Sequence, residues 1–397
     1  MRVDIVSKEY PPEIYGGAGV HVTELVAALR GSIEVQVRAF GADRDEEDTS
    51  SYRVPAELVG ANGALQTLGI DLEIVGDIGG ADVVHSHTWY ANFAGHLASL
   101  LHGIPHIVTA HSLEPLRPWK AEQLGGGYAV SSFIEKTAYE AAAAIVAVSD
   151  GMRRDILRSY PALDPDKVRV IYNGIDVAQW RPVRDDAFLR TAGIDPDRPS
   201  VVFVGRITRQ KGLPYLLRAV ESLPAGVQVV LCAGAPDTPQ ILEEVEGLVR
   251  GLQETREGVV WIDRLLPRDE LCTILAAATT FVCPSVYEPL GIVNLEAMAC
   301  GAAVVGTATG GIPEVVVDGV TGRLVPIEQV QDGTGTPVDP DAFVADLARV
   351  LTEVVSDPAR ARAYGDAGRR RAAEHFSWGA IAEQTAALYR EVAAAGR

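Results

Sequence analysis

The chain has 397 residues, more than one compact core usually holds, so its length predicts two domains of about 150 to 200 residues each. Apolar residues make up 47% of the chain and aromatic residues 6%, a composition that suits aliphatic buried strands and excludes a disordered or fibrous protein. A formal net charge of −18 argues against nucleic acid or an anionic membrane as partner, because either would require a basic surface.

The cysteines and the N-terminal segment carry no targeting or cross-linking signal. The four cysteines lack the close pairing of a zinc site or a disulfide framework, so we expect them to be buried and reduced: Cys232, Cys272, Cys283 and Cys300. No apolar run is long enough for a signal-peptide core or a membrane span. These features predict a cytoplasmic protein that binds small molecules, and a homo-oligomer is compatible with them.

Short β-branched runs alternate with helical segments along the whole chain. This alternation predicts right-handed βαβ crossovers, parallel sheets and an α/β fold with two Rossmann-like domains. The runs lie at 3–6, 33–37, 82–85, 107–110, 145–148 and 168–171, and then at 201–204, 227–232, 259–262, 280–283 and 303–305.

A polar, proline-bearing stretch at 181–200 separates the two series of runs. We therefore predict an N-terminal domain at 1–185 and a C-terminal domain at 186–375. The segment 376–397 is predicted to be an amphipathic helix that can pack back on the N-terminal domain.

The first glycine-rich segment follows the first strand and opens a helical stretch. Gly17, Ala18 and Gly19 would let backbone N–H groups approach a diphosphate at a helix N-terminus. A dinucleotide fingerprint would have a third glycine where Val22 stands, which disfavours a dehydrogenase. A structural turn and a ligand loop are both compatible with this segment.

A second loop joins the strand at 201–204 to a helix and carries Arg206 and Lys211. Such a strand-to-helix loop lies at the carboxyl edge of a parallel sheet, where α/β proteins bind ligands. Two cations there can stabilise charge that develops on a departing diphosphate. The alternative is a solvated charged loop.

The third segment is EPLGIVNLE at 288–296, and Pro289 is placed for a first helical position. The N–H groups near Leu290, Gly291 and Ile292 would then be available to phosphate oxygens. A continuous helix would separate Glu288 from Glu296 by about 12 Å, which suits the hexose and the ribose of one nucleotide-sugar. The acid and base of a glycosidase need roughly 5 to 9.5 Å, so this spacing disfavours hydrolysis.

Histidines follow two predicted strands, as HSHTWY at 85–90 and as TAHS around His111. A His-x-His pair can hold a metal ion, but the sequence places no further ligand, and single histidines more often have structural hydrogen bonds. We therefore predict no metal.

Together these segments resemble the glycogen synthase and sucrose synthase group of retaining glycosyltransferases, which have the GT-B fold. The resemblance covers nearly the whole chain: EYPPEIYGGAGVHVTEL at 9–25, HSHTWY, TAHS, NGID at 173–176, VGRITRQKG at 204–212, EPLGIVNLE, and GGIPEVV at 310–316. It implies two Rossmann-like domains that face each other across a cleft and a nucleotide-sugar donor, with no metal and no further cofactor.

The resemblance also implies roles at the matching positions. Arg206 and Lys211 would bind the donor diphosphate, and Glu288 would contact the transferred glucose. Glu296 would bind the ribose, and His111 would lie beside the reacting hexose. Backbone groups complete the expected donor site at Gly17, Ala18, Gly19, Asn173, Leu290, Gly291 and Ile292.

Two departures refine the expected function. Long-chain bacterial glycogen synthases begin the glycine loop with Lys-x-Gly-Gly, where this chain has Tyr15, and their His-Asp-Trp is here His87-Thr88-Trp89. The chain looks most like the short actinobacterial members, which join ADP-glucose to glucose 1-phosphate and form α-maltose 1-phosphate. Elongation of an α-1,4-glucan from ADP-glucose is the first alternative, and mannosyl transfer from GDP-mannose is a more remote one.

The segment 112–132 follows His111 directly and is a candidate acceptor site. Our hypothesis is that Arg117 or Lys120 binds the acceptor phosphate and that Trp119 or Tyr128 stacks on the sugar. A surface loop without a ligand is an equal alternative.

Overall fold

The computed structural model describes residues 1–395, with the backbone only at 122 and 123, and divides into two compact units. Unit 1 comprises Met1–Gly174 and the segment from Trp378 onwards, and unit 2 comprises Ile175–Ser377. The first division therefore comes at Gly174 and not at 185. The reason is a contact between the two linkers: Ile175 N donates to Phe376 O at 2.7 Å, so the stretch after 174 already belongs to unit 2.

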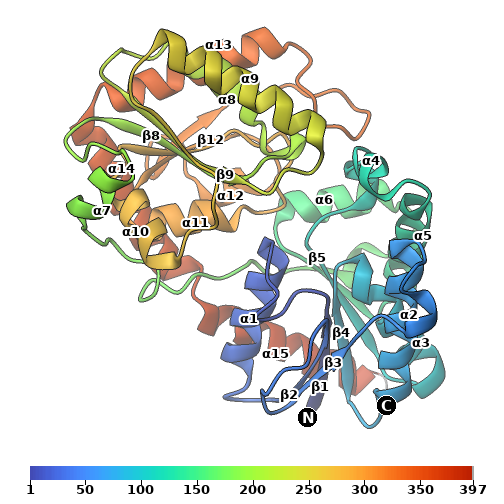
Figure 1. Ribbon diagram of the computed structural model, residues 1–397. Helices are drawn as coiled ribbons and strands as arrows, with labels where there is room; N and C mark the ends of the chain where they lie inside the picture. Colours follow the sequence, from blue (N-terminus) through green and yellow to red (C-terminus); the bar gives the residue numbers. More distant parts are fainter. Residues whose placement is uncertain (396–397) are drawn as a thin grey trace. The chain divides into compact units, whose positions relative to one another are not determined.

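Unit 1 contains a parallel sheet of seven strands in the order β3-β2-β1-β4-β5-β6-β7, with helices on both faces (Figure 1). Its strands are β1 (Arg2–Ser7), β2 (Glu34–Phe40), β3 (Thr49–Tyr52), β4 (Val83–His87), β5 (His106–Ala110), β6 (Ala144–Ala147) and β7 (Val168–Val170). Its α-helices are α1 (Gly17–Leu29), α2 (Gly63–Asp77), α3 (Trp89–His102), α4 (Lys120–Leu124), α5 (Gly127–Ala141), α6 (Asp150–Ser159) and α15 (Trp378–Ala395). Short 3-10 turns are η1 (Ala56–Leu58), η2 (Glu114–Leu116) and η3 (Pro165–Lys167).

The C-terminal helix α15 completes the core of unit 1. Ile381 and Tyr389 are fully buried in one apolar cluster with Leu25 and Leu29 of α1. Figure 1 shows α15 beside α1, although the whole of unit 2 separates them in the sequence. The C-terminal helix expected at 376–397 is therefore confirmed at Trp378–Ala395, and positions 396 and 397 lie outside the described residues.

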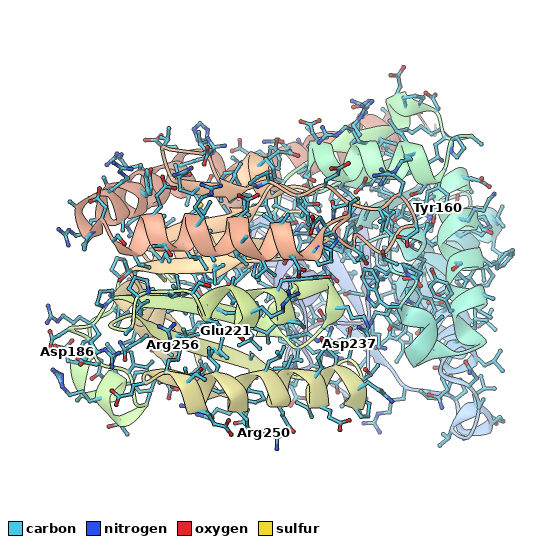
Figure 2. All side chains as sticks on the ribbon, turned by 90° about the horizontal axis from the view of Figure 1, so that it is seen from above. Tyr160, Asp186, Glu221, Asp237, Arg250 and Arg256 are labelled. Carbon is cyan, nitrogen blue, oxygen red and sulfur yellow. The ribbon has the colours of Figure 1, made fainter. Side chains whose placement is uncertain are left out.

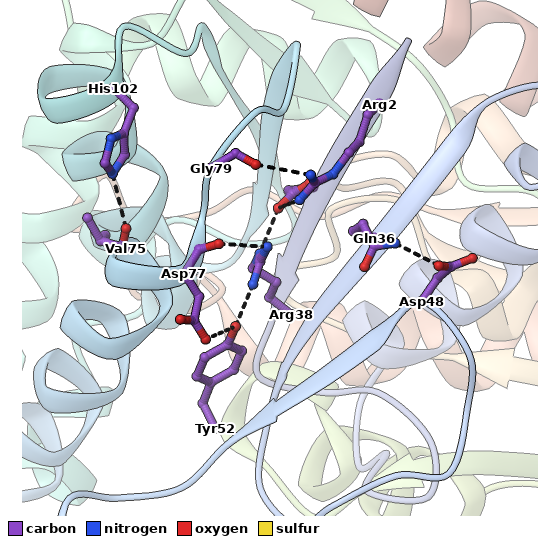
Figure 3. A network of polar contacts seen from close by, with 10 residues as sticks. Arg2, Gln36, Arg38, Asp48, Tyr52, Val75, Asp77, Gly79 and His102 are labelled. Carbon is purple, nitrogen blue, oxygen red and sulfur yellow. Dashed lines mark hydrogen bonds and ion pairs between the residues drawn. The ribbon is translucent and has the colours of Figure 1, made fainter.

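A buried polar network fixes the edge of this sheet (Figure 3). The guanidinium of Arg38, on β2, donates to Asp4 Oδ2 on β1 at 2.6 Å and to Tyr52 Oη on β3 at 2.5 Å. Tyr52 Oη in turn donates to Asp77 Oδ2 at the end of α2, at 3.1 Å. The carboxyl end of β3 is thereby held against β2 and α2.

Unit 2 contains a parallel sheet of six strands in the order β10-β9-β8-β11-β12-β13. Its strands are β8 (Ser200–Arg206), β9 (Gln228–Gly234), β10 (Val259–Ile262), β11 (Thr280–Cys283), β12 (Ala303–Thr307) and β13 (Gly322–Val325). Its helices are α7 (Asp186–Thr191), η4 (Arg209–Lys211), α8 (Leu213–Val220), α9 (Pro239–Thr255), α10 (Arg268–Ala277), α11 (Ile292–Ala299), α12 (Ile312–Val315), α13 (Pro340–Val355) and α14 (Pro358–His375).

The two parallel sheets confirm the predicted α/β fold with two Rossmann-like units. Every predicted run overlaps a strand, while β3 and β13 were missed because one is polar and the other begins with glycine. Both are edge strands, which need fewer apolar residues than strands buried on both sides. All four cysteines are buried and free, as expected. None of the described helices combines the length and hydropathy that a membrane span requires.

Candidate functional site

The loop after β8 in unit 2 is in close contact with the turn after β11. Gly212 has φ +66°, and a Cβ there would collide with the carbonyl oxygen of Pro284. Val286 N donates to Gln210 O at 2.9 Å, so a backbone hydrogen bond also joins the two segments. Because only glycine accepts both this φ and this approach, Gly212 brings the loop that carries Lys211 to the segment that carries Glu288.

Lys211 and Glu288 form a shielded ion pair at this edge. Lys211 Nζ lies 2.7 Å from Glu288 Oε2, and the side chains are 22% and 7% exposed. Ser285 Oγ donates to the same carboxylate oxygen at 3.0 Å. Burial lowers the pKa of Lys211, but the Glu288 carboxylate outweighs it and the net pKa is raised. The cation is therefore fixed in its charged form.

Two glycines clamp the main chain of Glu288. Gly311 N donates to Glu288 O at 2.9 Å, and a Cβ at Gly310, whose φ is +55°, would collide with that same oxygen. The GGIPEVV segment therefore positions Glu288 by close backbone contact, which no larger residue at 310 would permit.

Arg206 has a different partner from Lys211. Its Nη2 lies 2.5 Å from Asp237 Oδ1, on the loop between β9 and α9, where Figure 2 labels Asp237. The Arg206 side chain is 41% exposed and that of Asp237 only 9%. Arg206 is thus the last residue of β8 and Lys211 lies on the loop that follows. Each of these two predicted donor-binding cations already contacts a carboxylate.

The helix in the EPLGIVNLE segment begins later than predicted. Pro289 is not in the first turn, because Gly291, with φ +90°, is the N-cap and α11 starts at Ile292. The separation of about 12 Å between Glu288 and Glu296, which assumed one continuous helix, therefore does not apply. Leu290 is buried, so at this position only its backbone can serve a ligand.

Glu296 and Asn294 are unusual polar groups on α11. Burial, aided by Cys272 and opposed by Arg268 and Lys211, raises the pKa of Glu296 to about 7. The amide of Asn294 is fully buried, and among the described residues neither its nitrogen nor its oxygen has a hydrogen-bond partner. Such an unpaired buried amide is rare in proteins and marks this first turn as more than a packing element.

The glycine loop of unit 1 contacts a carboxylate of the chain itself. Tyr15 N and Gly16 N donate to Glu9 Oε2 at 3.1 and 2.7 Å. A Cβ at Gly19 would come within 2.8 Å of Glu9 Cβ, so the loop lies directly on this side chain. Helix α1 begins at Gly17, as expected of an anion-binding loop, but the anion observed at its entrance is Glu9.

His111 lies in a group of neutral imidazoles in unit 1. Its Nε2 is 3.0 Å from His87 Nδ1, and burial holds the pKa of both well below the usual range. Burial also lowers the pKa of His21 to about 4, although the nearby side chain of Asn173 opposes this shift. Asn173 thus belongs with the histidines of unit 1, whereas the other NGID residues after Gly174 belong to unit 2.

Three of these histidines are close enough to share a metal ion. The ligand atoms of His21, His87 and His111 lie within 4.8 Å of one another, and neutral imidazole is the form that binds metals. A third ligand, which the sequence did not place, is therefore present. That the protein requires no metal stays a prediction.

Side chains of the 112–132 segment are largely engaged in holding the segment together. Arg117 Nη2 lies 2.6 Å from Glu114 Oε1, and Tyr128 Oη donates to Glu114 O at 2.6 Å. Ser131 Oγ donates to Glu114 Oε2, also at 2.6 Å. The fully buried Glu114 is therefore the centre of this segment, and Lys120 begins helix α4.

Several of these residues had not been singled out from the sequence. Asp237 and Ser285 follow predicted strands, so their position at a sheet edge was the available signal. Asn294 is a polar residue among the apolar residues that begin α11, and this contrast can be seen in the sequence. Glu9 gave no signal, because its contact with the glycine loop depends on tertiary structure.

Two family models match the chain, one to each unit. Glycosyltransferase Family 4 matches residues 15–179, and Glycosyl transferases group 1 matches residues 198–353. Together with the two parallel sheets, these matches define a glycosyltransferase with the GT-B fold.

Relatives narrow this class. An α-maltose-1-phosphate synthase from Mycolicibacterium smegmatis is 57% identical over 399 residues, which cover 99% of this chain and 100% of the relative. The chain therefore belongs to the glycosyltransferase family that includes this synthase. A D-inositol 3-phosphate glycosyltransferase from Xylanimonas cellulosilytica is 32% identical over 393 residues, covering 91% of this chain and 88% of the relative. The solved sucrose-phosphate synthase from Thermosynechococcus elongatus superimposes with a TM-score of 0.78 at 25% identity, covering 99% of both chains.

Proposed function

We propose that this chain transfers glucose from ADP-glucose to glucose 1-phosphate with retention of configuration, and so forms α-maltose 1-phosphate for α-glucan synthesis. The observation that carries the proposal is the 57% identity, over 99% of the chain, to a relative named for that product. The Lys211–Glu288 pair supports it, because it presents a fixed cation beside a carboxylate at the sheet edge.

A phosphorylated acceptor is also supported by the names of the relatives. The M. smegmatis relative is named for maltose 1-phosphate and the X. cellulosilytica relative for inositol 3-phosphate. Each name contains a ring compound that bears a phosphate group, as the product in the first name and as the substrate in the second. This favours glucose 1-phosphate over the glucan chain that was the first alternative.

In the proposed reaction, the bond between glucose C1 and the diphosphate oxygen of ADP-glucose breaks. A bond forms from C1 to O4 of glucose 1-phosphate, and the O4 proton passes to an oxygen of the departing phosphate. The products are ADP and α-maltose 1-phosphate. Negative charge develops on the diphosphate, so fixed cations near it lower the barrier.

The residues of unit 2 have separate proposed roles. Lys211 and Arg206 stabilise the leaving diphosphate, for which each must exchange its carboxylate partner for phosphate oxygens. Glu288 accepts hydrogen bonds from the transferred glucose, and Ser285 holds the carboxylate in place. The backbone at Gly291 and Ile292 donates to phosphate oxygens.

A matrix of donors and acceptors tests the proposal. ADP-, UDP- and GDP-glucose, and GDP-mannose, are each incubated with glucose 1-phosphate or glycogen, and initial rates and product anomers are recorded. We expect ADP-glucose with glucose 1-phosphate to give the highest rate and an α-linked product. A higher rate with glycogen would favour the glucan alternative, and a mannosyl product would contradict the proposal altogether.

A further inference from the structure

A pocket of about 440 Å³ opens within unit 1, a volume typical of small-molecule sites. Residues just beyond the ends of four strands line it: Lys8 after β1, Gly41 after β2, Arg53 after β3 and Trp89 two residues after β4. The strand order of the sheet reverses between β1 and β4. Open α/β sheets bind ligands at the carboxyl ends of their strands where this reversal occurs, so the pocket has the position of a ligand site.

Lys8 presents its cation to aromatic rings in this pocket. Its Nζ lies 3.7 Å from the centroid of the Tyr90 ring and 5.9 Å from that of Tyr15. No carboxylate in the part of the chain that the structure describes lies within ion-pairing distance of this Nζ. Burial lowers the pKa of Lys8, while Glu9 opposes the effect. An anionic ligand would supply a direct counter-charge to Lys8.

Arg53 is a second cation on the same wall. Arg53 Nη2 lies 2.9 Å from Asp43 Oδ2, and the two side chains are 65% and 82% exposed. Such an exposed pair contributes little, so a phosphate can replace it at small cost. The preceding residue, Tyr52, is fixed by the network of Figure 3, which anchors the strand end from which Arg53 projects.

The other walls have groups that suit a sugar ring. Ala42 N donates to Glu13 Oε1 at 3.3 Å, which places the carboxylate over Gly41 as an acceptor for hydroxyl groups. Trp89 and Tyr90 stack with their ring centroids 4.2 Å apart, and Tyr15 is 53% exposed. Aromatic surface, one carboxylate and two cations together are the chemistry of a sugar phosphate site.

We propose that this pocket binds the acceptor as a phosphorylated hexose, with Lys8 and Arg53 on the phosphate and Glu13 on the ring hydroxyls. The inference rests on the proposed function for the identity of the acceptor. It differs from the hypothesis for the 112–132 segment, because Arg117 is already paired with the buried Glu114. Helix α4 of that segment contributes Leu124 to the pocket wall.

Direct binding measurements test this inference separately from turnover. Calorimetry is used to measure the Kd of glucose 1-phosphate for the full chain and for the variants Lys8→Met and Arg53→Gln. We expect each variant to raise this Kd by about tenfold, because a charge-assisted contact is lost, and to leave the Kd of ADP-glucose unchanged. Lys136→Met is the matched control, since Lys136 is an exposed cation of α5 paired with Glu140. It should change neither Kd.

A third variant distinguishes binding of the sugar ring from binding of the phosphate group. Glu13→Gln should raise the Kd of glucose 1-phosphate several-fold and leave inhibition by inorganic phosphate unchanged. Because Arg53 is exposed, Arg53→Gln keeps the test valid even if replacement of the more buried Lys8 disturbs folding.

The outcomes distinguish this inference from the proposed function. If glucose 1-phosphate binds in a manner that depends on Lys8 but no α-maltose 1-phosphate forms, the inference stands and the proposed function fails. If α-maltose 1-phosphate forms and both cation variants keep the wild-type KM and Kd for glucose 1-phosphate, the inference is overturned. It is also overturned if maltotriose occupies the pocket and glucose 1-phosphate does not compete with it.

Discussion

Lys211 in unit 2 and Lys8 in unit 1 both lie at the carboxyl edge of a sheet, but their cations have different neighbours. In unit 2, Lys211 and Arg206 each contact a carboxylate, at 2.7 and 2.5 Å. In unit 1, Lys8 faces aromatic rings. A phosphate that binds Lys211 or Arg206 must displace a carboxylate, whereas a phosphate that binds Lys8 supplies a counter-charge to it. Replacing a cation in unit 2 therefore leaves a shielded carboxylate without that cation, and replacing Lys8 does not.

The largest effect is expected at the Lys211–Glu288 pair. Lys211→Met should lower kcat by about 10² to 10³-fold, because a fixed charge beside the leaving group is lost. Glu288→Gln should lower it by a similar factor, and steady-state kinetics at saturating ADP-glucose measures both.

Arg209→Gln is the control for this loop, because Arg209 is exposed on the same turn η4. Its kcat should stay near the wild-type value. Equal losses in Arg209→Gln and Lys211→Met would mean that general loop charge, and not the ion pair, matters.

The next largest effect on kcat is expected from Gly310, which contacts the main chain of Glu288. Gly310→Ala should lower kcat at least tenfold, because the new Cβ collides with Glu288 O. Gly319→Ala is matched, since its φ is +73° but a Cβ there meets nothing within 4 Å. That control should lose only about 1 to 2 kcal/mol of stability, the cost of a left-handed backbone. Unchanged kcat in Gly310→Ala would remove the positioning role.

A smaller effect is expected from the titration of Glu296. Its pKa is raised to about 7, so the carboxylate that would bind the ribose is increasingly protonated below that pH. We expect kcat/KM for ADP-glucose to fall roughly fivefold between pH 7 and pH 6. In Glu296→Gln the value should be low and this pH dependence absent. A wild-type profile that is flat across this range would contradict the assignment.

The last effect is on stability alone and concerns Glu135 in unit 1. Burial, with a contribution from Glu114, raises the pKa of Glu135 from 4.5 to about 8, although Tyr160 Oη donates to it at 2.5 Å. Between these two pKa values the folded state therefore holds a proton that the unfolded state releases. The contribution of Glu135 to stability is fully present below pH 4.5 and is lost as the pH rises towards 8. Each unit of the shift contributes about 1.4 kcal/mol.

Thermal melting at pH 5 and pH 8.5 measures this decline. Glu135→Gln should lose less stability than the wild type over that interval, while turnover stays unchanged. An identical decline in both proteins would show that Glu135 does not hold the proton.

Much of the fold could be predicted because central parallel strands are continuous apolar runs. Edge strands such as β3 lack that pattern, since one side of the strand is unpaired. The start of α11 was misplaced because Pro289 suits a first turn, whereas the left-handed φ of Gly291 sets the real boundary.

The candidate site was only partly predictable for a similar reason. Short motifs placed Lys211 and Glu288 at strand ends, but their contact joins residues far apart in the chain and depends on the approach of Gly212 to Pro284. Tertiary structure also produces the ion pair of Arg206 with Asp237 and the hydrogen bonds of Glu9 with the glycine loop. No local pattern encodes them.

A competition between acceptors tests the central claim most directly. Radiolabelled ADP-glucose is incubated with the protein and with glucose 1-phosphate and glycogen together, and the label is separated by molecular size. We predict that the label enters a phosphorylated disaccharide whose new linkage is α-1,4. Label found in glycogen, with none in the disaccharide, would contradict the account.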